Sequence, residues 1–181
     1  MDQEIYEELF EIAKEAGFTG YTDMDVSTIE LRDEVRAACA EGKCGAYGNN
    51  WTCPPACGDL DTCRARVAKF THGIILQTTG ELEDALDYES MTDIGKAHRE
   101  NFANFMKAVS GKYPSSLGLG AGGCRICEKC NYPEPCRFPQ LAYSSMEGYG
   151  MVVSDVCRAN NIKYYYGENT LTYVACFLFN V

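Results

Sequence analysis

The second half of the chain contains four cysteines whose spacing is typical of a metal site. Residues 124–136 read C-R-I-C-E-K-C-N-Y-P-E-P-C, which is C-x2-C-x2-C-x5-C. Bacterial ferredoxins bind an iron–sulfur cluster through the related run C-x2-C-x2-C-x3-C-P, whereas zinc ribbons place two C-x2-C pairs far apart. The spacing therefore favours a cluster over zinc, and its late fourth cysteine leaves the fourth ligand less defined. The predicted ligands are Cys124, Cys127, Cys130 and Cys136.

Another group of cysteines, the first along the chain, precedes this run with the spacing C-x4-C-x8-C-x3-C-x5-C. Its members are Cys39, Cys44, Cys53, Cys57 and Cys63. Pro54 and Pro55 stiffen the backbone after the third cysteine, and nearby glycines permit the tight turns that wrapping an ion requires. We expect the first three to bind a second cluster, with either Cys57 or Cys63 as fourth ligand. Alternatively, some of them complete the other site, and Cys63 also lies on an apolar helical stripe, where it could be a core residue.

Basic residues accompany the C-x2-C-x2-C-x5-C run in an otherwise acidic chain. Arg125, Lys129 and Arg137 lie within or beside the run, and they would stabilise an anionic thiolate cluster. The whole chain has 16 basic and 26 acidic residues, a net charge of -10, which disfavours nucleic acid as a partner. Another basic group, at positions 64, 66 and 69, is interpreted as a solvated helix face.

Size and composition indicate one packed domain spanning residues 1–181. The N-terminus lacks the basic start and apolar middle of a signal peptide, and no run approaches eighteen apolar residues. We therefore expect a cytoplasmic protein with no membrane partner, in which eleven cysteines serve metal or redox chemistry rather than disulfides. With only His72 and His98 available, a metal site must be mostly thiolate, which suits iron–sulfur or zinc.

Apolar periodicity predicts the elements that position these cysteines. Helical spacing is found over residues 5–16, 60–70, 94–109 and 146–157. Strand patterns cover about 25–31, 73–79, 117–121 and 171–179, the last apolar on both faces like a central strand. The order predicts an α/β fold, a single-domain layered sheet with flanking helices and two cysteine-rich metal-binding loops at strand ends. Cys157, Cys176 and His98 fall within apolar patterns and are interpreted as core residues.

Two strings in the sequence resemble a known family. They are Y-G-N-N-W-T-C-P-P-A-C-G and G-A-G-G-C-R-I-C-E-K-C-N-Y-P-E-P-C-R-F-P, followed by S-M-E-G-Y-G. They resemble the prokaryotic predicted metal-binding proteins (domain of unknown function 2284), over roughly Val26 to Val181. The resemblance implies metal binding, with an iron–sulfur centre as the expected form. It assigns this role to the C-x2-C-x2-C-x5-C run and to the group that starts with Cys39, Cys44 and Cys53.

Three functions from different classes fit these features. The first is a redox or electron-transfer protein with up to two [4Fe-4S] clusters, acting on a partner protein or a small-molecule substrate. The second is an enzyme in which three cysteines hold a cluster and leave one iron open to substrate or sulfide. The third is a binding protein stabilised by zinc. The sequence contains no phosphate-binding glycine loop and no serine-nucleophile motif that would indicate another enzyme class.

Overall fold

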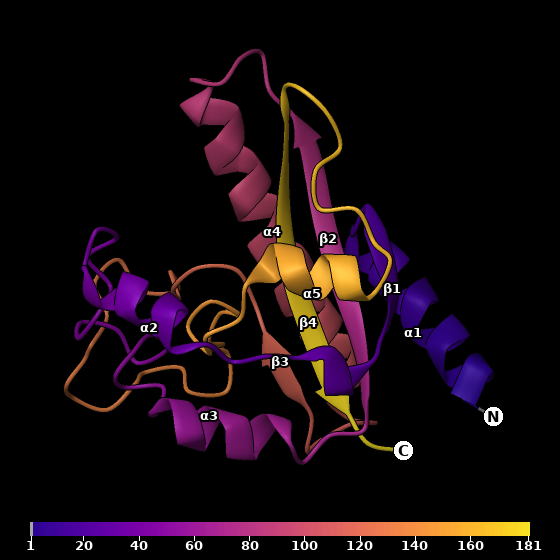
Figure 1. Ribbon diagram of the computed structural model, residues 1–181, viewed down its shortest axis with the longest axis horizontal. Helices are drawn as coiled ribbons and strands as arrows, with labels where there is room; N and C mark the ends of the chain where they lie inside the picture. Colours follow the sequence, from indigo (N-terminus) through magenta and orange to yellow (C-terminus); the bar gives the residue numbers. More distant parts are fainter. Residues whose placement is uncertain (1) are drawn as a thin grey trace.

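A four-stranded antiparallel sheet forms the centre of the computed structural model, which describes residues 2–181. Its strands are β1 (Gly20–Met24), β2 (His72–Glu81), β3 (Leu117–Leu119) and β4 (Thr170–Phe179), in the order β1-β2-β4-β3 (Figure 1). The long strands β2 and β4 pair along their whole length, from His72 opposite Phe179 to Glu81 opposite Thr170. Their apolar runs are buried on both faces, as predicted for a central strand.

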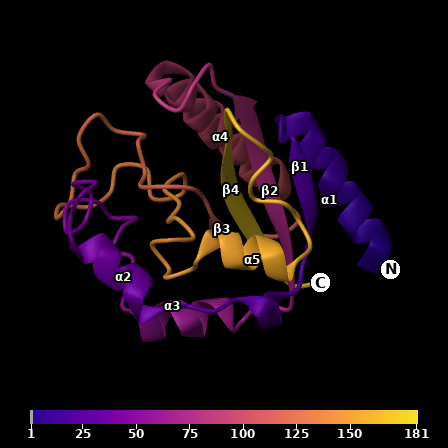
Figure 2. The same cartoon turned by 45° about the horizontal axis from the view of Figure 1, so that its top comes forward.

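Helices cover both faces of this sheet (Figure 2). They are α1 (Asp2–Ala16), α2 (Asp33–Ala40), α3 (Leu60–Val67), α4 (Tyr88–Val109) and α5 (Val153–Ala159). On one face, α1 and α4 bury an aromatic core that includes Phe105 and Phe177. On the other, α3 and α5 pack residues such as Cys63, Val156 and Cys157 against the strands. The layered α/β prediction is confirmed. Within residues 2–181, the helices fall short of the length and apolar character that crossing a membrane requires.

The strand predicted at about residues 25–31 is wrong. The first strand ends at Met24, and Val26–Thr28 form a single 3-10 turn. The cause is Asp25, whose carboxylate accepts hydrogen bonds from the backbone N–H and hydroxyl of Ser27, at 2.9 and 2.6 Å. Such local side-chain bonds occupy the donors that a strand would use in a ladder. Helix α2 then begins at Asp33, in a segment for which apolar periodicity predicted no helix.

The helix predicted over residues 146–157 is confirmed only in its second half. Met146 and Tyr149 are buried, but they lie in a turn that precedes α5. Gly150 ends this turn with a φ of 93°, a backbone conformation that a helix cannot include. A Cβ at this position would approach the backbone oxygen of Arg32 to 3.1 Å, so glycine is also required for the close contact.

The two cysteine-rich loops follow different kinds of secondary-structure element. The first, residues 41–59, follows helix α2 rather than a strand, whereas the second, residues 120–146, follows β3 as predicted. Both loops lie together beyond the β3 edge of the sheet, at the left of Figure 1. The sheet edge and helices α2 and α3 therefore form the frame that carries all the candidate metal ligands.

Cys157, Cys176 and His98 are core residues, as predicted. Their side chains are 0, 0 and 1% exposed. His98 Nδ1 lies 3.0 Å from the hydroxyl oxygen of Thr78, and its ring stacks on Tyr173 with centroids 5.9 Å apart. Burial lowers the pKa of His98 to about 4, with a smaller contribution from the charge of Arg99. The histidine is therefore neutral at pH 7.

This shift of the His98 pKa makes the fold acid-sensitive. Because the unfolded chain binds a proton near pH 6.5 and the folded chain only near pH 4, stability falls as the pH drops through this window. We expect the free energy of unfolding to fall by about 2 kcal/mol more between pH 7 and pH 5 in the wild type than in His98→Gln. Urea denaturation at the two pH values measures this change in the free energy of unfolding. His72→Gln is the control and should behave as the wild type; equal pH dependence in all three proteins would contradict the assignment.

Candidate metal centres

The second cysteine loop is closed at its base by backbone hydrogen bonds. Gly120 donates to Ser144 at 2.8 Å, and Met146 donates to the Gly120 carbonyl at 3.0 Å, so the chain returns to the point at which it left β3. Between these contacts the four sulfurs are half-buried and line one pocket. Burial raises the pKa of Cys124, and the three neighbouring thiols raise it further. The predicted ligands Cys124, Cys127, Cys130 and Cys136 are therefore brought together.

The donor chemistry of this pocket fits a thiolate-bound metal. Its lining contains no carboxylate and no imidazole, only the four cysteines with amide, hydroxyl, aromatic, aliphatic and guanidinium groups. The cavity holds about 20 Å³, which is room for a single ion rather than a four-iron cluster. Within residues 2–181, moreover, no three Cys, His, Asp or Glu side chains converge closely enough to hold one ion. Binding of an ion therefore requires the sulfurs to move inward, and binding of a cluster requires the loop to widen.

The first group of cysteines forms a chain of neighbouring thiols rather than one ring. Cys39 lies in the last turn of α2, Cys44 is exposed in the next turn, and Cys53 is buried after them. Burial raises the pKa of Cys53, and the thiols of Cys44, Cys39 and Cys124 add to this effect. The last of these belongs to the second loop. A thiol of the second loop is thus close enough to affect the pKa of a thiol in the first loop.

Cys57 and Cys63 form a buried hydrogen-bonded pair. The bond from the Cys57 thiol lowers the pKa of Cys63 to about 7, with further lowering by the nearby charges of Arg36 and Arg66. The same bond raises the pKa of Cys57 well above its ordinary value, because Cys57 keeps the proton. Cys63 also packs in the core, which confirms the second of the two roles expected for it.

Arg36 supports this pair and was missed in the sequence analysis. Its guanidinium lies 3.6 Å from the Cys63 sulfur and donates to the carbonyls of Gly148 at 3.1 Å and Gly58 at 2.7 Å. It therefore joins α2, α3 and the turn before α5 around the thiols. An isolated arginine four residues before the end of α2 gives no spacing signal, which is why sequence reasoning did not find it.

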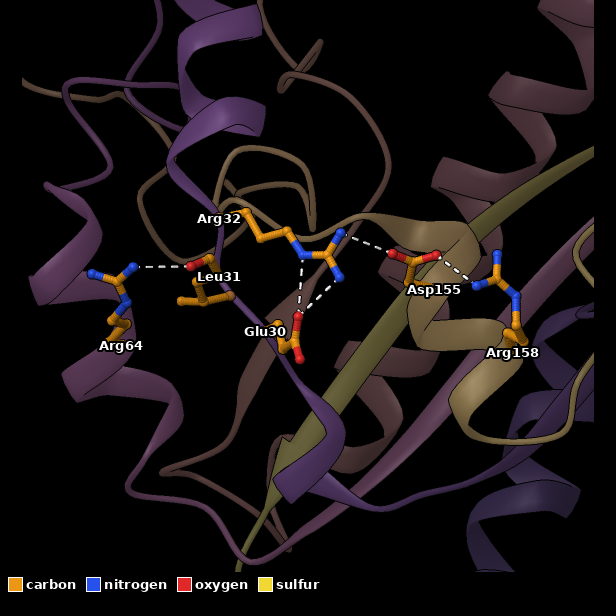
Figure 3. Close-up of polar contacts among 6 residues, drawn as sticks. All are labelled: Glu30, Leu31, Arg32, Arg64, Asp155 and Arg158. Atoms are coloured by element: carbon orange, nitrogen blue, oxygen red, sulfur yellow. Dashed lines mark hydrogen bonds and ion pairs between the residues drawn. The ribbon is translucent and has the colours of Figure 1, made fainter.

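The basic group of α3 is more than a solvated face. Arg66 donates to the carbonyl of Cys57 at 2.5 Å and to the Tyr149 hydroxyl at 3.2 Å. Arg64 donates to the carbonyl of Leu31 at 3.0 Å, and so holds α3 against the segment before α2 (Figure 3). Both arginines are exposed, as expected for a solvated face, but each also bonds to the backbone of another segment.

A line of ion pairs continues this frame towards α5 (Figure 3). Arg32 lies 2.9 Å from Glu30 and 3.0 Å from Asp155, and Asp155 lies 3.1 Å from Arg158. These groups are partly exposed, so each pair contributes little energy by itself. Together they fix the segment that enters α2, and with it Cys39.

Glu147 is a second residue that sequence reasoning missed. Burial raises the pKa of its carboxyl, which accepts hydrogen bonds from Ser145 and from the backbone of Gly122. Its Oε2 has no hydrogen-bond partner among the described residues, and its charge acts on Cys39. The carboxyl therefore lies near both the second loop and Cys39, where burial disfavours its charged form.

The tripeptide Asn50-Trp51-Thr52 clasps the second loop to the first. The Cys124 N–H donates to Thr52 Oγ1 at 3.0 Å, and Asn50 Nδ2 donates to the Cys124 carbonyl at 3.0 Å. Asn50 Oδ1 accepts from both the N–H and the hydroxyl of Thr52, at 3.0 and 2.9 Å. Both side chains are buried, at 8 and 4% exposure. Every polar bond in this clasp therefore supports the backbone of the first predicted ligand.

Trp51 extends the clasp to the far end of the second loop. Its Nε1 donates to the Glu134 carbonyl at 2.8 Å, and its ring meets Tyr132 edge-to-face with centroids 5.0 Å apart. At the near end, a Cβ added to Gly123 would lie 3.0 Å from the Cys53 sulfur. The backbone of the second loop therefore packs against Cys53 of the first loop, and the absence of a side chain at Gly123 allows this close contact.

We expect Thr52→Val to loosen the second loop. Valine has a similar shape but leaves the Cys124 N–H without a partner and removes one of the two hydrogen bonds to Asn50 Oδ1, which should cost about 1–3 kcal/mol. Hydrogen exchange of the Cys124 amide should become faster, and metal retention during dialysis should fall. Thr62→Val, on the exposed face of α3, is the matched control. Unchanged exchange at Cys124 in Thr52→Val would show that the clasp does not hold the loop.

Comparison with known proteins agrees with a metal-binding role. A family model described as predicted metal-binding protein (DUF2284) matches residues 22–179. Searches of curated proteins and of solved structures gave no match. The matched range contains both cysteine loops, the clasp and all four strands except the first two residues of β1. The chain therefore belongs to the family of predicted metal-binding proteins.

Proposed function

We propose that the protein is an electron-transfer protein whose two cysteine loops bind iron–sulfur clusters, up to two of the [4Fe-4S] type. The observation that carries this proposal is the shared pocket of the four second-loop sulfurs, one wall of which is the first loop. Their C-x2-C-x2-C spacing supports a cluster over a single ion. When bound, such clusters supply one-electron transfer.

The ligands in this proposal come from both loops. In the second loop they are Cys124, Cys127, Cys130 and Cys136. In the first they are Cys39, Cys44 and Cys53, with Cys57 or Cys63 as the fourth, because both thiols lie beside the Arg36 guanidinium. Arg36 and Arg66 offset the negative charge of these thiolates in a chain with a net charge of -10. The contact of Gly123 with Cys53 supports close spacing of the two centres, which electron exchange requires.

A zinc-stabilised protein is a second candidate, and the size of the second-loop pocket favours it. A cavity of about 20 Å³ suits one ion without any widening of the loop. The enzyme alternative, with a cluster held by three cysteines, further requires a ligand pocket beside the loop. The redox proposal differs from the zinc candidate in metal identity and from the enzyme in whether an iron can take an outside ligand.

Replacing one predicted ligand in each loop tests the cluster assignment. We expect anaerobically purified wild type to contain about eight iron atoms per chain and Cys127→Ser to contain about four. Cys44→Ser should lose the other half. Cys157→Ala, in the core, is the control and should keep the wild-type iron content. Equal iron in Cys127→Ser and the wild type would refute the second-loop site, and stoichiometric zinc without iron would establish the zinc candidate instead.

Titration with small ligands separates electron transfer from catalysis at an open iron. We expect cyanide to leave the electron paramagnetic resonance signals of the reduced protein unchanged, because four thiolates complete the ligation of each cluster. The matched comparison is Cys136→Ser, in which a serine oxygen replaces the late fourth cysteine. A shift in the wild-type signal on adding cyanide would favour the enzyme over the electron-transfer protein.

A further inference from the structure

A second pocket adjoins the cysteine loop on the side of helix α4. Its volume is about 480 Å³, within the range typical of sites for small organic ligands. One wall is α4, and the other is the backbone of residues 120–124, where two glycines, Gly122 and Gly123, leave the surface open. Cys124 lines both this pocket and the cavity of the four sulfurs. A molecule held here would therefore lie against the second candidate metal centre.

The charged groups of this pocket are mostly cationic. Lys96 and Arg99 project from α4, and Arg125 comes from the opposite loop. The acidic side chain in the lining is Glu100, whose carboxylate lies 4.0 Å from the Lys96 ammonium, and both are exposed. Three cations facing one carboxylate, in a chain with a net charge of -10, form a local positive potential. This potential favours the binding of an anion over that of a neutral molecule or a cation.

The remaining lining is apolar and partly aromatic. Phe102 and Tyr143 meet edge-to-face with centroids 5.3 Å apart. At the mouth, Ile126 and Leu141 are 44 and 49% exposed, and a bound molecule would cover apolar surface that now faces water. Flat aromatic walls and aliphatic rims complement a planar apolar body.

The pocket lining also includes a buried polar atom that has no partner. His98 lines the pocket, and its Nε2 makes no hydrogen bond within residues 2–181. An unsatisfied buried nitrogen costs free energy, which a hydrogen bond to a ligand or water would recover. This observation is independent of the surface charges and supports a bound molecule.

We propose that this pocket binds a small organic anion, such as a carboxylate, with a planar apolar body. The proposal rests on the proposed function only in that a metal centre in the second loop makes the anion a candidate redox substrate. The pocket itself consists mainly of residues outside the ligand set, so binding can be measured separately from metal content.

Calorimetry with a matched pair of probes tests the proposal on protein purified without oxygen. The probes are 2-naphthoate and the uncharged 2-naphthamide, which share the same ring system. We expect one naphthoate per chain and at least tenfold weaker binding of the amide. Arg99→Gln and Arg125→Gln should each weaken naphthoate binding about fivefold or more. Lys107→Gln on α4 and Lys129→Gln on the same loop lie outside the pocket lining and should have no such effect.

Filling the pocket provides a second test that does not alter charge. Ala103→Trp places a large side chain at an exposed position of α4 inside the pocket and should abolish naphthoate binding, whereas Ala108→Trp on the same helix should not. The proposal would be overturned if the wild type did not bind naphthoate. It would also be overturned if naphthoate affinity were unchanged in Arg99→Gln, Arg125→Gln and Ala103→Trp. Iron and zinc are measured on the same samples. Pocket-dependent binding in a metal-free protein would support the pocket and contradict the proposed function.

Discussion

The hydrogen bonds that join Asn50 and Thr52 to Cys124 are the constraint on which the rest of the site depends. Residues 41–59 and 120–146 contain little regular structure, and loops of this length rarely hold a fixed shape without contacts to a rigid neighbour. The clasp provides such contacts, because it is buried and uses both backbone polar groups of Cys124. It thereby places the thiols of one loop beside those of the other, and it sets one wall of the α4 pocket.

The two loops differ in the basic side chains that could compensate the negative charge of their thiolates. In the first, buried cysteines are balanced by Arg36 and Arg66, which also join helices α2 and α3 to neighbouring backbone. In the second, the cysteines are half-buried and the nearby basic side chains are exposed. In the proposed arrangement the second-loop centre faces solvent, which suits exchange with an outside molecule. The α4 pocket, which touches Cys124, adds a place for that molecule.

Sequence patterns predicted the parts of the molecule that depend on local order. Continuous apolar runs located β2 and β4, a helical stripe located α4, and the C-x2-C-x2-C run located the second loop. The parts that were missed depend on contacts distant in the chain. Thr52 and Cys124 are 72 positions apart, and Arg36 reaches Gly148 across 112. No spacing rule connects such pairs, and a single Asp25 was enough to end a strand that apolar content alone predicted.

The central claim is that two metal centres lie side by side, one in each clasped loop. Anomalous X-ray scattering at the iron edge, from crystals grown without oxygen, measures this most directly. The account predicts two separate iron peaks of several atoms each, one within the second loop and one against Cys53, on opposite sides of the Gly123 contact. A single peak, an anomalous signal at the zinc edge alone, or first-loop sulfurs paired in disulfides would contradict it.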